Sequence, residues 1–158
     1  MQMNYKTTNN LDYEINFLEK KDLFLITSLC KQLGFEGSLQ DLENRFHDLS
    51  CFSNHQVRVA KQKSNENIIG FIHFFEAPYL LTCKTLEIGG LVVENKFRRF
   101  GIGKILMQEA EKWAMLKGCK SVLLATQIMR TDAQAFYEQI GYQKEFQTFF
   151  LRKYFDHI

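Results

Sequence analysis

A strand-to-helix junction, NKFRRFGIGKIL at residues 95–106, constrains the fold of this chain more than any other stretch. The run TLEIGGLVV before it, residues 85–93, has the apolar and β-branched composition of a strand. After it, apolar residues recur every three or four positions up to Leu116, as on one face of a helix. The first N–H groups of a helix lack partners within the helix and carry the positive end of its dipole. The junction therefore predicts an anion site, with phosphate as the natural ligand.

The residues of this junction allow two interpretations. Gly101 and Gly103 would let phosphate oxygens approach the backbone closely. Three basic side chains would add positive charge: Arg98, Arg99 and Lys104. Alternatively, the glycines only permit a tight turn, and the basic side chains are solvated surface.

Counting residues excludes two nucleotide-binding loops. A Walker loop, G-x-x-x-x-G-K-[ST], would need glycine at position 98 and Ser or Thr after Lys104, but the chain has Arg98 and Ile105 there. A Rossmann fingerprint, G-x-G-x-x-G, would need a third glycine where the chain has Leu106. The junction matches neither.

Changes of hydrophobic period divide the chain into alternating helices and strands. Ser38 is the expected N-cap of the second helix, and the paired glycines within residues 85–93 predict a bulge or a close backbone approach in mid-strand. The expected elements, in order, are a strand at 13–18, helices at 20–33 and 39–49, strands at 56–61, 68–75 and 85–93, a helix at 102–117, a buried strand at 121–126, a helix from 131 that Gly141 ends, and a closing strand at 148–155. This order predicts an α/β layer structure with antiparallel strands early and a β-α-β unit later.

Composition favours one soluble domain over residues 1–158. Apolar residues make up 46% of the 158, and no run approaches the roughly 20 apolar residues of a membrane span. The net charge of +2 is too small for a general nucleic-acid or membrane-surface footprint, so neither partner is expected. The polar N-terminus lacks the apolar core of a signal peptide, which favours a cytoplasmic location.

The cysteines and histidines give no sign of a metal site. The four cysteines are far apart and lie in apolar contexts, so we interpret them as reduced, structural thiols. The four histidines show no ligand spacing. No metal is therefore expected.

Two motifs, in order, resemble those of the GCN5-related N-acetyltransferases. Arg98-x-x-Gly101-x-Gly103 after a strand matches the family pattern [R/Q]-x-x-G-x-[G/A], and EIGGLVVENKFRRFGIGKILMQEAEKWA resembles the family's fourth strand, pyrophosphate loop and third helix throughout. RTDAQAFYEQIGY, residues 130–142, resembles its later A-x-x-F-Y-E-x-x-G-[F/Y] helix. The resemblance implies the family's fold: a mixed, mostly antiparallel central sheet of about six to seven strands, flanked by about four helices and splayed at the cofactor site.

By this resemblance, acetyl-CoA would lie between the strand ending near Val93 and the strand SVLLAT. The backbone of Leu91, Val92 and Val93 would hold the pantetheine arm and polarise the thioester carbonyl. The junction would bind the pyrophosphate through its N–H groups, with the charged side chain of Arg98 beside them. These N–H groups belong to Arg99, Phe100, Gly101, Ile102, Gly103 and Lys104.

The resemblance also suggests a base and an acid. A primary amine with a pKa of about 10.4 is neutral only about once in a thousand near neutral pH, so a base is useful. Glu87, four residues before Leu91, is the candidate base, and a solvent-facing glutamate is the alternative. Tyr137 matches the family's usual acid, which would protonate the departing CoA thiolate. Many members have Asn seven residues before this tyrosine, whereas this chain has Arg130, whose role stays open.

Two further glutamates lie where this family builds its acceptor pocket. Glu36, after the first helix, and Glu76, interpreted as part of a loop, would attract a cationic amine there, or else lie on the surface. The closing strand is expected either to be core or to bury part of a homodimer interface.

The resemblance implies an acyl-CoA-dependent N-acyltransferase. The amine would attack acetyl-CoA directly in a ternary complex, because no cysteine lies near the motifs to form a covalent intermediate. A small or aminoglycoside-like amine is favoured as acceptor, with a protein N-terminus or lysine as further candidates. The alternative is a non-catalytic acyl-CoA-binding sensor or scaffold.

Overall fold

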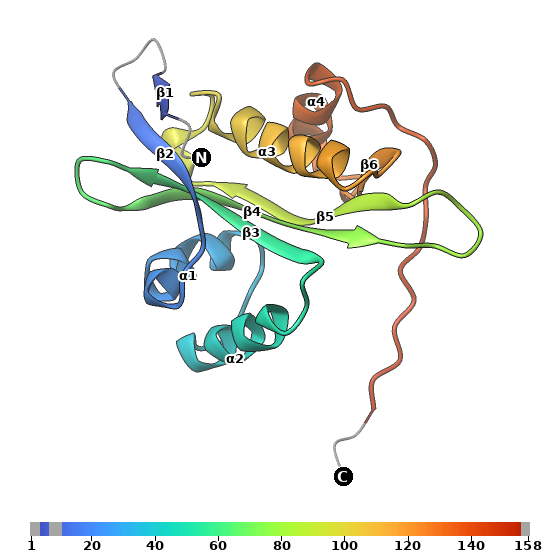
Figure 1. Ribbon diagram of the computed structural model, residues 1–158, viewed down its shortest axis with the longest axis horizontal. Helices are drawn as coiled ribbons and strands as arrows, with labels where there is room; N and C mark the ends of the chain where they lie inside the picture. The colour runs from blue at the N-terminus through green and yellow to red at the C-terminus, as the bar shows by residue number, and fades with distance from the viewer. Residues whose placement is uncertain (1–3, 7–10, 156–158) are drawn as a thin grey trace. The chain divides into compact units, whose positions relative to one another are not determined.

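A computed structural model describes residues 4–6 and 11–155 (Figure 1). The chain forms two compact units, a first that ends at Ala125 and a second that begins at Thr126. The first unit holds one six-stranded sheet in the order β1-β2-β3-β4-β5-β6. Its strands are β1 (Asn4–Lys6), β2 (Asp12–Phe17), β3 (His55–Gln62), β4 (Ile68–Ala77), β5 (Thr85–Val93) and β6 (Ser121–Leu124).

The strands from β1 to β5 pair antiparallel, and β6 pairs parallel to β5. The helices of the first unit are η1 (Lys20–Asp22), α1 (Leu23–Gln32), α2 (Leu39–Ser50), η2 (Asn95–Phe97) and α3 (Ile102–Leu116); the second unit holds α4 (Thr131–Gln139). The expected mixed, mostly antiparallel sheet with its helices is therefore confirmed. The expectation of one domain over the whole chain stays a prediction.

Helices cover both faces of the sheet (Figure 1). On one face, α1 packs against the strands in a cluster that includes Val59, Phe71 and Val92. On the other, the α3 residues Leu106 and Met107 are fully buried. Because side chains alternate along a strand, each strand sends every second residue to each of these cores.

Local signals in the sequence place most helix ends correctly. Ser38 caps α2: its hydroxyl accepts a hydrogen bond from the Asp41 N–H at 3.1 Å, and the Asp41 carboxylate accepts one from the Ser38 N–H at 2.7 Å. Gly101 precedes α3 with a φ of 81°, a left-handed conformation that favours glycine.

The predicted irregularity in the middle of β5 is a bulge. His73 of β4 pairs with Gly90 and Phe74 pairs with Ile88, so Gly89 has no counterpart in the register. A Cβ on Gly89 would lie 2.5 Å from His73 Nδ1, closer than real side chains approach. Both the bulge and the close approach are therefore present.

The closing strand predicted at 148–155 is wrong: these residues form neither helix nor strand. The strand at 121–126 is also shorter and less buried than expected, because β6 lies at the edge of the sheet and Leu123 is partly exposed. Six aromatic or aliphatic side chains between residues 146 and 155 are largely exposed: Phe146, Phe149, Phe150, Leu151, Tyr154 and Phe155. A run of apolar residues indicates burial only when a neighbouring element is there to cover it.

All four cysteines are free thiols, as expected. Cys30 is buried in the α1 core, which fits a structural role. Cys51 and Cys83 are exposed, so the structural interpretation does not extend to them.

Candidate functional site

Among the residues that the structure describes, no strand pairs with one edge of the C-terminal half of β5. Pairing with β6 runs from Thr85–Ser121 to Ile88–Leu124 and stops there, whereas β5 continues to Val93. The Glu94 N–H donates to the Ile69 carbonyl of β4 at 2.9 Å. Because successive N–H groups along a strand point to opposite sides, those of Val93 and Leu91 point away from β4, toward the unpaired edge.

The N-terminus of α3 follows this edge and has no side-chain cap. The first bond of the helix runs from the Ile105 N–H to the Gly101 carbonyl at 3.1 Å. The N–H groups of Ile102, Gly103 and Lys104 precede that bond and so have no acceptor within the helix. The 15-residue helix thus presents these donors, at the positive end of its dipole, next to the unpaired edge of β5.

The basic side chains of the junction differ in their contacts. Arg98 folds back, and its Nε donates to the Val93 carbonyl at 3.1 Å, which ties the loop to the end of β5. Arg99 is exposed and holds the left-handed conformation, with a φ of 67°. Lys104 is exposed on the first turn of α3. Arg99 and Lys104 therefore keep the surface position that an anion site needs.

The apolar residues of this region serve the core. Val92 and Ile102 are buried, and Leu91 and Phe100 are half-buried. That these residues contribute to a ligand through their backbone stays a prediction.

Glu87 lies on the α1 face of β5, opposite Phe75 of β4. The hydroxyl of Tyr79, in the loop after β4, donates a hydrogen bond to its carboxylate. That carboxylate raises the pKa of Tyr79. Glu87 is half-buried, and its carboxylate is held by this neighbouring side chain. Its role as base stays a prediction, beside the alternative of a solvent-facing glutamate.

Tyr137 lies on α4, in the second unit. Burial raises the pKa of its phenol, and the positive charge of Arg130 opposes this in part. Its ring packs edge-to-face against Phe136 and Tyr142, with centroids 5.1 and 6.0 Å apart. The phenol is therefore fixed and protonated at neutral pH, and its place opposite a cofactor stays a prediction.

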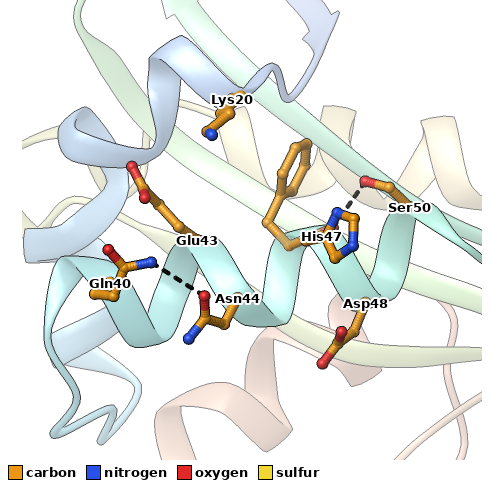
Figure 2. Close-up of a pocket in the computed structure, with 8 residues that line it drawn as sticks. Lys20, Gln40, Glu43, Asn44, His47, Asp48 and Ser50 are labelled. Atoms are coloured by element: carbon orange, nitrogen blue, oxygen red, sulfur yellow. Dashed lines mark hydrogen bonds between the residues drawn. The ribbon is translucent and has the colours of Figure 1, made fainter.

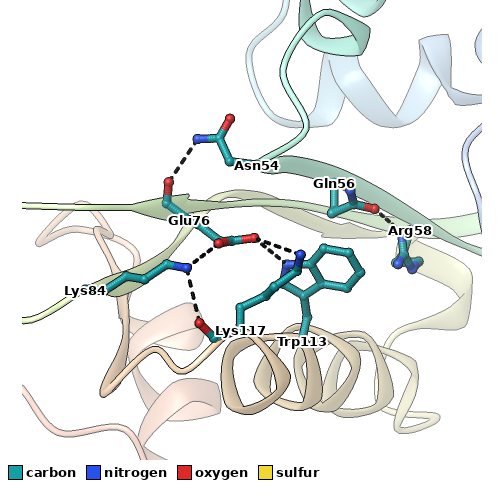
Figure 3. A network of polar contacts seen from close by, with 7 residues as sticks. All are labelled: Asn54, Gln56, Arg58, Glu76, Lys84, Trp113 and Lys117. Carbon is teal, nitrogen blue, oxygen red and sulfur yellow. Dashed lines mark hydrogen bonds and ion pairs between the residues drawn. The ribbon is translucent and has the colours of Figure 1, made fainter.

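Glu76 corrects the sequence-based interpretation. It belongs to β4 rather than to a loop, and it is buried on the α3 face (Figure 3). Its carboxylate accepts from Lys84 Nζ at 2.5 Å and from Trp113 Nε1 at 3.3 Å, with Lys117 Nζ at 3.9 Å. Because Lys84, Lys117 and Trp113 already pair with this carboxylate inside the protein, Glu76 does not bind the amine acceptor. Glu36 is exposed between α1 and α2.

Sequence reasoning also missed a pair of histidines. His55 Nδ1 and His73 Nε2 are 3.0 Å apart, on neighbouring strands of the α1 face. Their residues lie 18 apart in the sequence, and the only available signal was that each occupies a core-facing position of a strand.

A hollow of about 500 Å³ lies along α2 (Figure 2). Within it, Gln40 donates to Asn44 at 3.1 Å, and Ser50 donates to the Phe46 carbonyl at 2.7 Å. It is lined by Lys20, Gln40, Glu43, Asn44, Phe46, His47, Asp48 and Ser50. None of these residues belongs to β5 or α3, so this hollow is separate from the site built on those elements.

Neither a metal site nor a membrane span emerges from the described residues. In 4–6 and 11–155, no three His, Cys, Asp or Glu side chains come together as metal ligands. Over the same residues, no helix has both the length and the apolar character to cross a membrane.

Comparison with known proteins decides the family. The sequence profile of the Acetyltransferase (GNAT) family matches residues 22–142, which include the β5 edge, the α3 N-terminus and α4. The chain belongs to the GNAT family of acetyltransferases. Human N-acetyltransferase 8 is 31% identical over 90 residues, and mouse N-acetyltransferase family 8 member 3 is 34% identical over 71 residues. The matched regions are 56% and 45% of this chain but only 39% and 31% of those proteins, so this GNAT chain spans about a third of their length.

Solved structures show the same GNAT fold. Aminoglycoside N-acetyltransferase AAC(6')-Iy, in complex with CoA, superposes with a TM-score of 0.81 at 20% identity, over 94% of this chain and 99% of that one. Glucosamine-6-phosphate N-acetyltransferase from Arabidopsis thaliana gives 0.76 at 23% identity, over 91% and 99%.

Proposed function

We propose that this GNAT protein transfers an acetyl group from acetyl-CoA to a primary amine, by direct attack in a ternary complex. The observation that carries the proposal is the uncapped N-terminus of α3 beside the unpaired edge of β5. The helix terminus would bind the pyrophosphate of CoA, and the β5 edge would bind its amide-bearing arm. One cofactor with both a diphosphate and a chain of amides satisfies both features.

In this proposal the donor is held mainly by backbone groups. The N–H groups of Leu91 and Val93, with Val92 between them as a core residue, bind the arm and polarise the thioester carbonyl. The pyrophosphate meets the N–H groups from Arg99 through Phe100 and Gly101 to Lys104. Arg98 also supports the loop, because its Nε donates to the Val93 carbonyl.

The reaction requires a balanced set of proton transfers. An ammonium ion first loses a proton to become a nucleophile, and the nitrogen loses a second proton after it has attacked the carbonyl carbon. The CoA sulfur gains one proton as the C–S bond breaks. We propose that Glu87 takes the first proton and that Tyr137 supplies the proton to sulfur.

A small amine is the favoured acceptor. AAC(6')-Iy is an aminoglycoside N-acetyltransferase, and the Arabidopsis enzyme is a glucosamine-6-phosphate N-acetyltransferase. Aminoglycosides and glucosamine 6-phosphate both carry amino groups on sugars. The carboxylate of Glu87, on the α1 face, would attract such a cation. A protein N-terminus or lysine is the second acceptor class, and a homodimer is the proposed assembly.

The test combines a binding and a turnover measurement. Acetyl-CoA is titrated calorimetrically, and free CoA release is then followed against a panel of aminoglycosides, amino sugars, polyamines and lysine or N-terminal peptides. Binding with release that depends on one amine class supports the proposal. Binding without release for any amine would instead indicate an acyl-CoA sensor, and no binding would refute the cofactor assignment.

A further inference from the structure

Two imidazoles form a hydrogen-bonded pair on the α1 face of the sheet. His55 begins β3, and its Nδ1 lies 3.0 Å from Nε2 of His73 on β4. The His55 ring stacks on Phe75, with centroids 4.7 Å apart, and its other neighbour is Phe52 at 5.8 Å. The pair is therefore held in a fixed geometry by aromatic contacts rather than by acidic partners.

The free nitrogen of this pair lies against the bulge of β5. His73 pairs with Gly90, and its Nδ1 is the ring atom nearest to where a Gly89 side chain would begin. With glycine at both positions, β5 has no side chain of its own beside the ring. Gly89 is exposed, and Leu33 Cδ1 lies 3.5 Å from where a Gly90 Cβ would be. His73 Nε2 is already engaged by His55, so Nδ1 is the nitrogen left to meet a ligand there.

The register around the bulge also relates His73 to the two β5 residues proposed to act in the reaction. Leu91, whose N–H is assigned to the thioester carbonyl, directly follows Gly90 in the His73 row. Glu87 is two pairs further along the register from His73, opposite Phe75. In the register, Leu91 is therefore one pair away from His73 and three pairs away from Glu87.

We propose that His73 accepts the second proton of the reaction and that His55 relays it toward solvent. This inference rests on the proposed acetyl transfer. When the amine attacks, its nitrogen becomes cationic, and that proton passes to His73 Nδ1. The Nε2 proton of His73 then moves to His55 Nδ1, and His55 releases a proton from its own Nε2. One proton enters the pair and one leaves, so no net charge accumulates.

The burial of the two imidazoles favours passing a proton on over holding it. Burial, with the neighbouring His55, lowers the pKa of His73 to about 4, and burial lowers the pKa of His55 as well. Both rings are therefore neutral at pH 7 and ready to accept. Other charged or titratable groups on this side of the sheet are Glu87 of β5 with its partner Tyr79, the Lys61–Asp22 ion pair, Arg45 of α2 over the Phe35 ring, and Cys30 of α1.

The decisive experiment compares His73→Gln, His55→Gln and the double variant. Each is assayed with acetyl-CoA and the amine that the wild type turns over best, from about pH 6 to pH 9. We expect His73→Gln to lower kcat about 100-fold and His55→Gln about 10-fold, with acetyl-CoA affinity unchanged. The double variant should be no slower than His73→Gln alone, because His55 acts only through His73. Added imidazole should restore part of the rate of His73→Ala.

Glu87→Gln and His47→Gln serve as comparisons. Glu87→Gln should change how kcat depends on pH through ionisation of the free amine. It should leave the non-additivity of the two histidine substitutions unchanged. His47→Gln, on exposed α2, should behave as wild type. Melting temperatures monitor folding, and if His73→Gln is unfolded, His55→Gln and its response to imidazole decide the matter.

The outcomes separate this inference from the function it rests on. A wild type that binds acetyl-CoA but acetylates no amine overturns both. A wild type that turns over, together with unchanged kcat in His73→Gln or with independent, multiplicative effects of the two histidine changes, overturns the relay alone.

Discussion

Tyr137 is the residue whose replacement tests proton delivery to sulfur. Tyr137→Phe should lower kcat about 100-fold and leave acetyl-CoA affinity unchanged, because the ring remains and only the acidic proton is lost. Since burial raises the pKa of this phenol, the wild-type rate should fall only at a pH above the ordinary tyrosine range. Steady-state kinetics and calorimetry measure the two quantities. Exposed Tyr154→Phe is the matched control, and an unaltered kcat in Tyr137→Phe would remove this residue from the acid role.

The bulge in β5 shows how one extra residue changes which face of the sheet its neighbours occupy. Glu87 and Leu91 are four apart, a spacing that places both side chains on one face of a regular strand. Gly89 adds a residue without a counterpart, so Glu87 lies opposite Phe75 on the α1 face and Leu91 lies opposite Ile72 on the α3 face. The paired glycines predicted an irregularity, but only the register shows which side chains it separates.

At the scale of an element, the N-terminus of α3 is the expected anion site. Gly103→Val should weaken CoA binding at least about 100-fold, because a branched side chain on the first turn holds phosphate oxygens away from the N–H groups. Valine is a better helix former than glycine, so loss of the helix cannot explain the result. Calorimetric titration with CoA measures the effect. Met115→Val, exposed near the other end of α3, is the control, and wild-type affinity in Gly103→Val would contradict the pyrophosphate assignment.

The polar contacts between β4 and α3 make the stability of this layer depend on pH. Burial by itself raises the pKa of Glu76, but hydrogen bonds from Lys84 and Trp113 and the charges of Lys84 and Lys117 outweigh it, so its pKa is lowered. The stabilisation is therefore complete above the unfolded-state pKa of roughly 4.3 and is lost as the pH falls through the lower, folded-state value.

Glu76→Gln should accordingly reduce the free energy of unfolding by about 1–3 kcal/mol at pH 7. The difference from wild type should shrink below about pH 4, where the wild-type carboxylate becomes protonated. Urea unfolding across this pH range measures it, with exposed Glu145→Gln as the control. A difference that does not vary with pH would show that packing, not charge, is what the substitution removes.

At the scale of the whole molecule, the residues after α4 suggest self-association. Phe149 and Phe150 are 92% and 81% exposed, and monomers rarely leave such aromatic clusters in water. The edge strand β6 also offers unpaired backbone groups to a second copy. We expect sedimentation to show a dimer that Phe149→Ser with Phe150→Ser converts to monomer, while exposed Gln147→Ser leaves it intact. A wild type that is monomeric at all concentrations would exclude this.

The sequence alone determined the features that depend on neighbours along the chain. The cap at Ser38, the left-handed Gly101 and the strand-to-helix junction are local, because the hydrogen bonds and dihedral angles that define them lie within a few residues. The family resemblance rests on two local motifs, this junction and the later helix at 130–142, and the family and its mixed sheet were predicted correctly for that reason.

Tertiary structure decided which side chains face each other and which are covered by a neighbouring element. The sequence assigned Glu76 to a loop. Only its pairing in β4 and the nearby α3 show that its carboxylate is buried and ion-paired. The contact between His55 and His73 arises from strand register across 18 residues, which no local pattern records. The apolar run at 148–155 failed as a strand because a strand needs a partner for its backbone, and hydrophobicity along a chain does not specify where that partner lies.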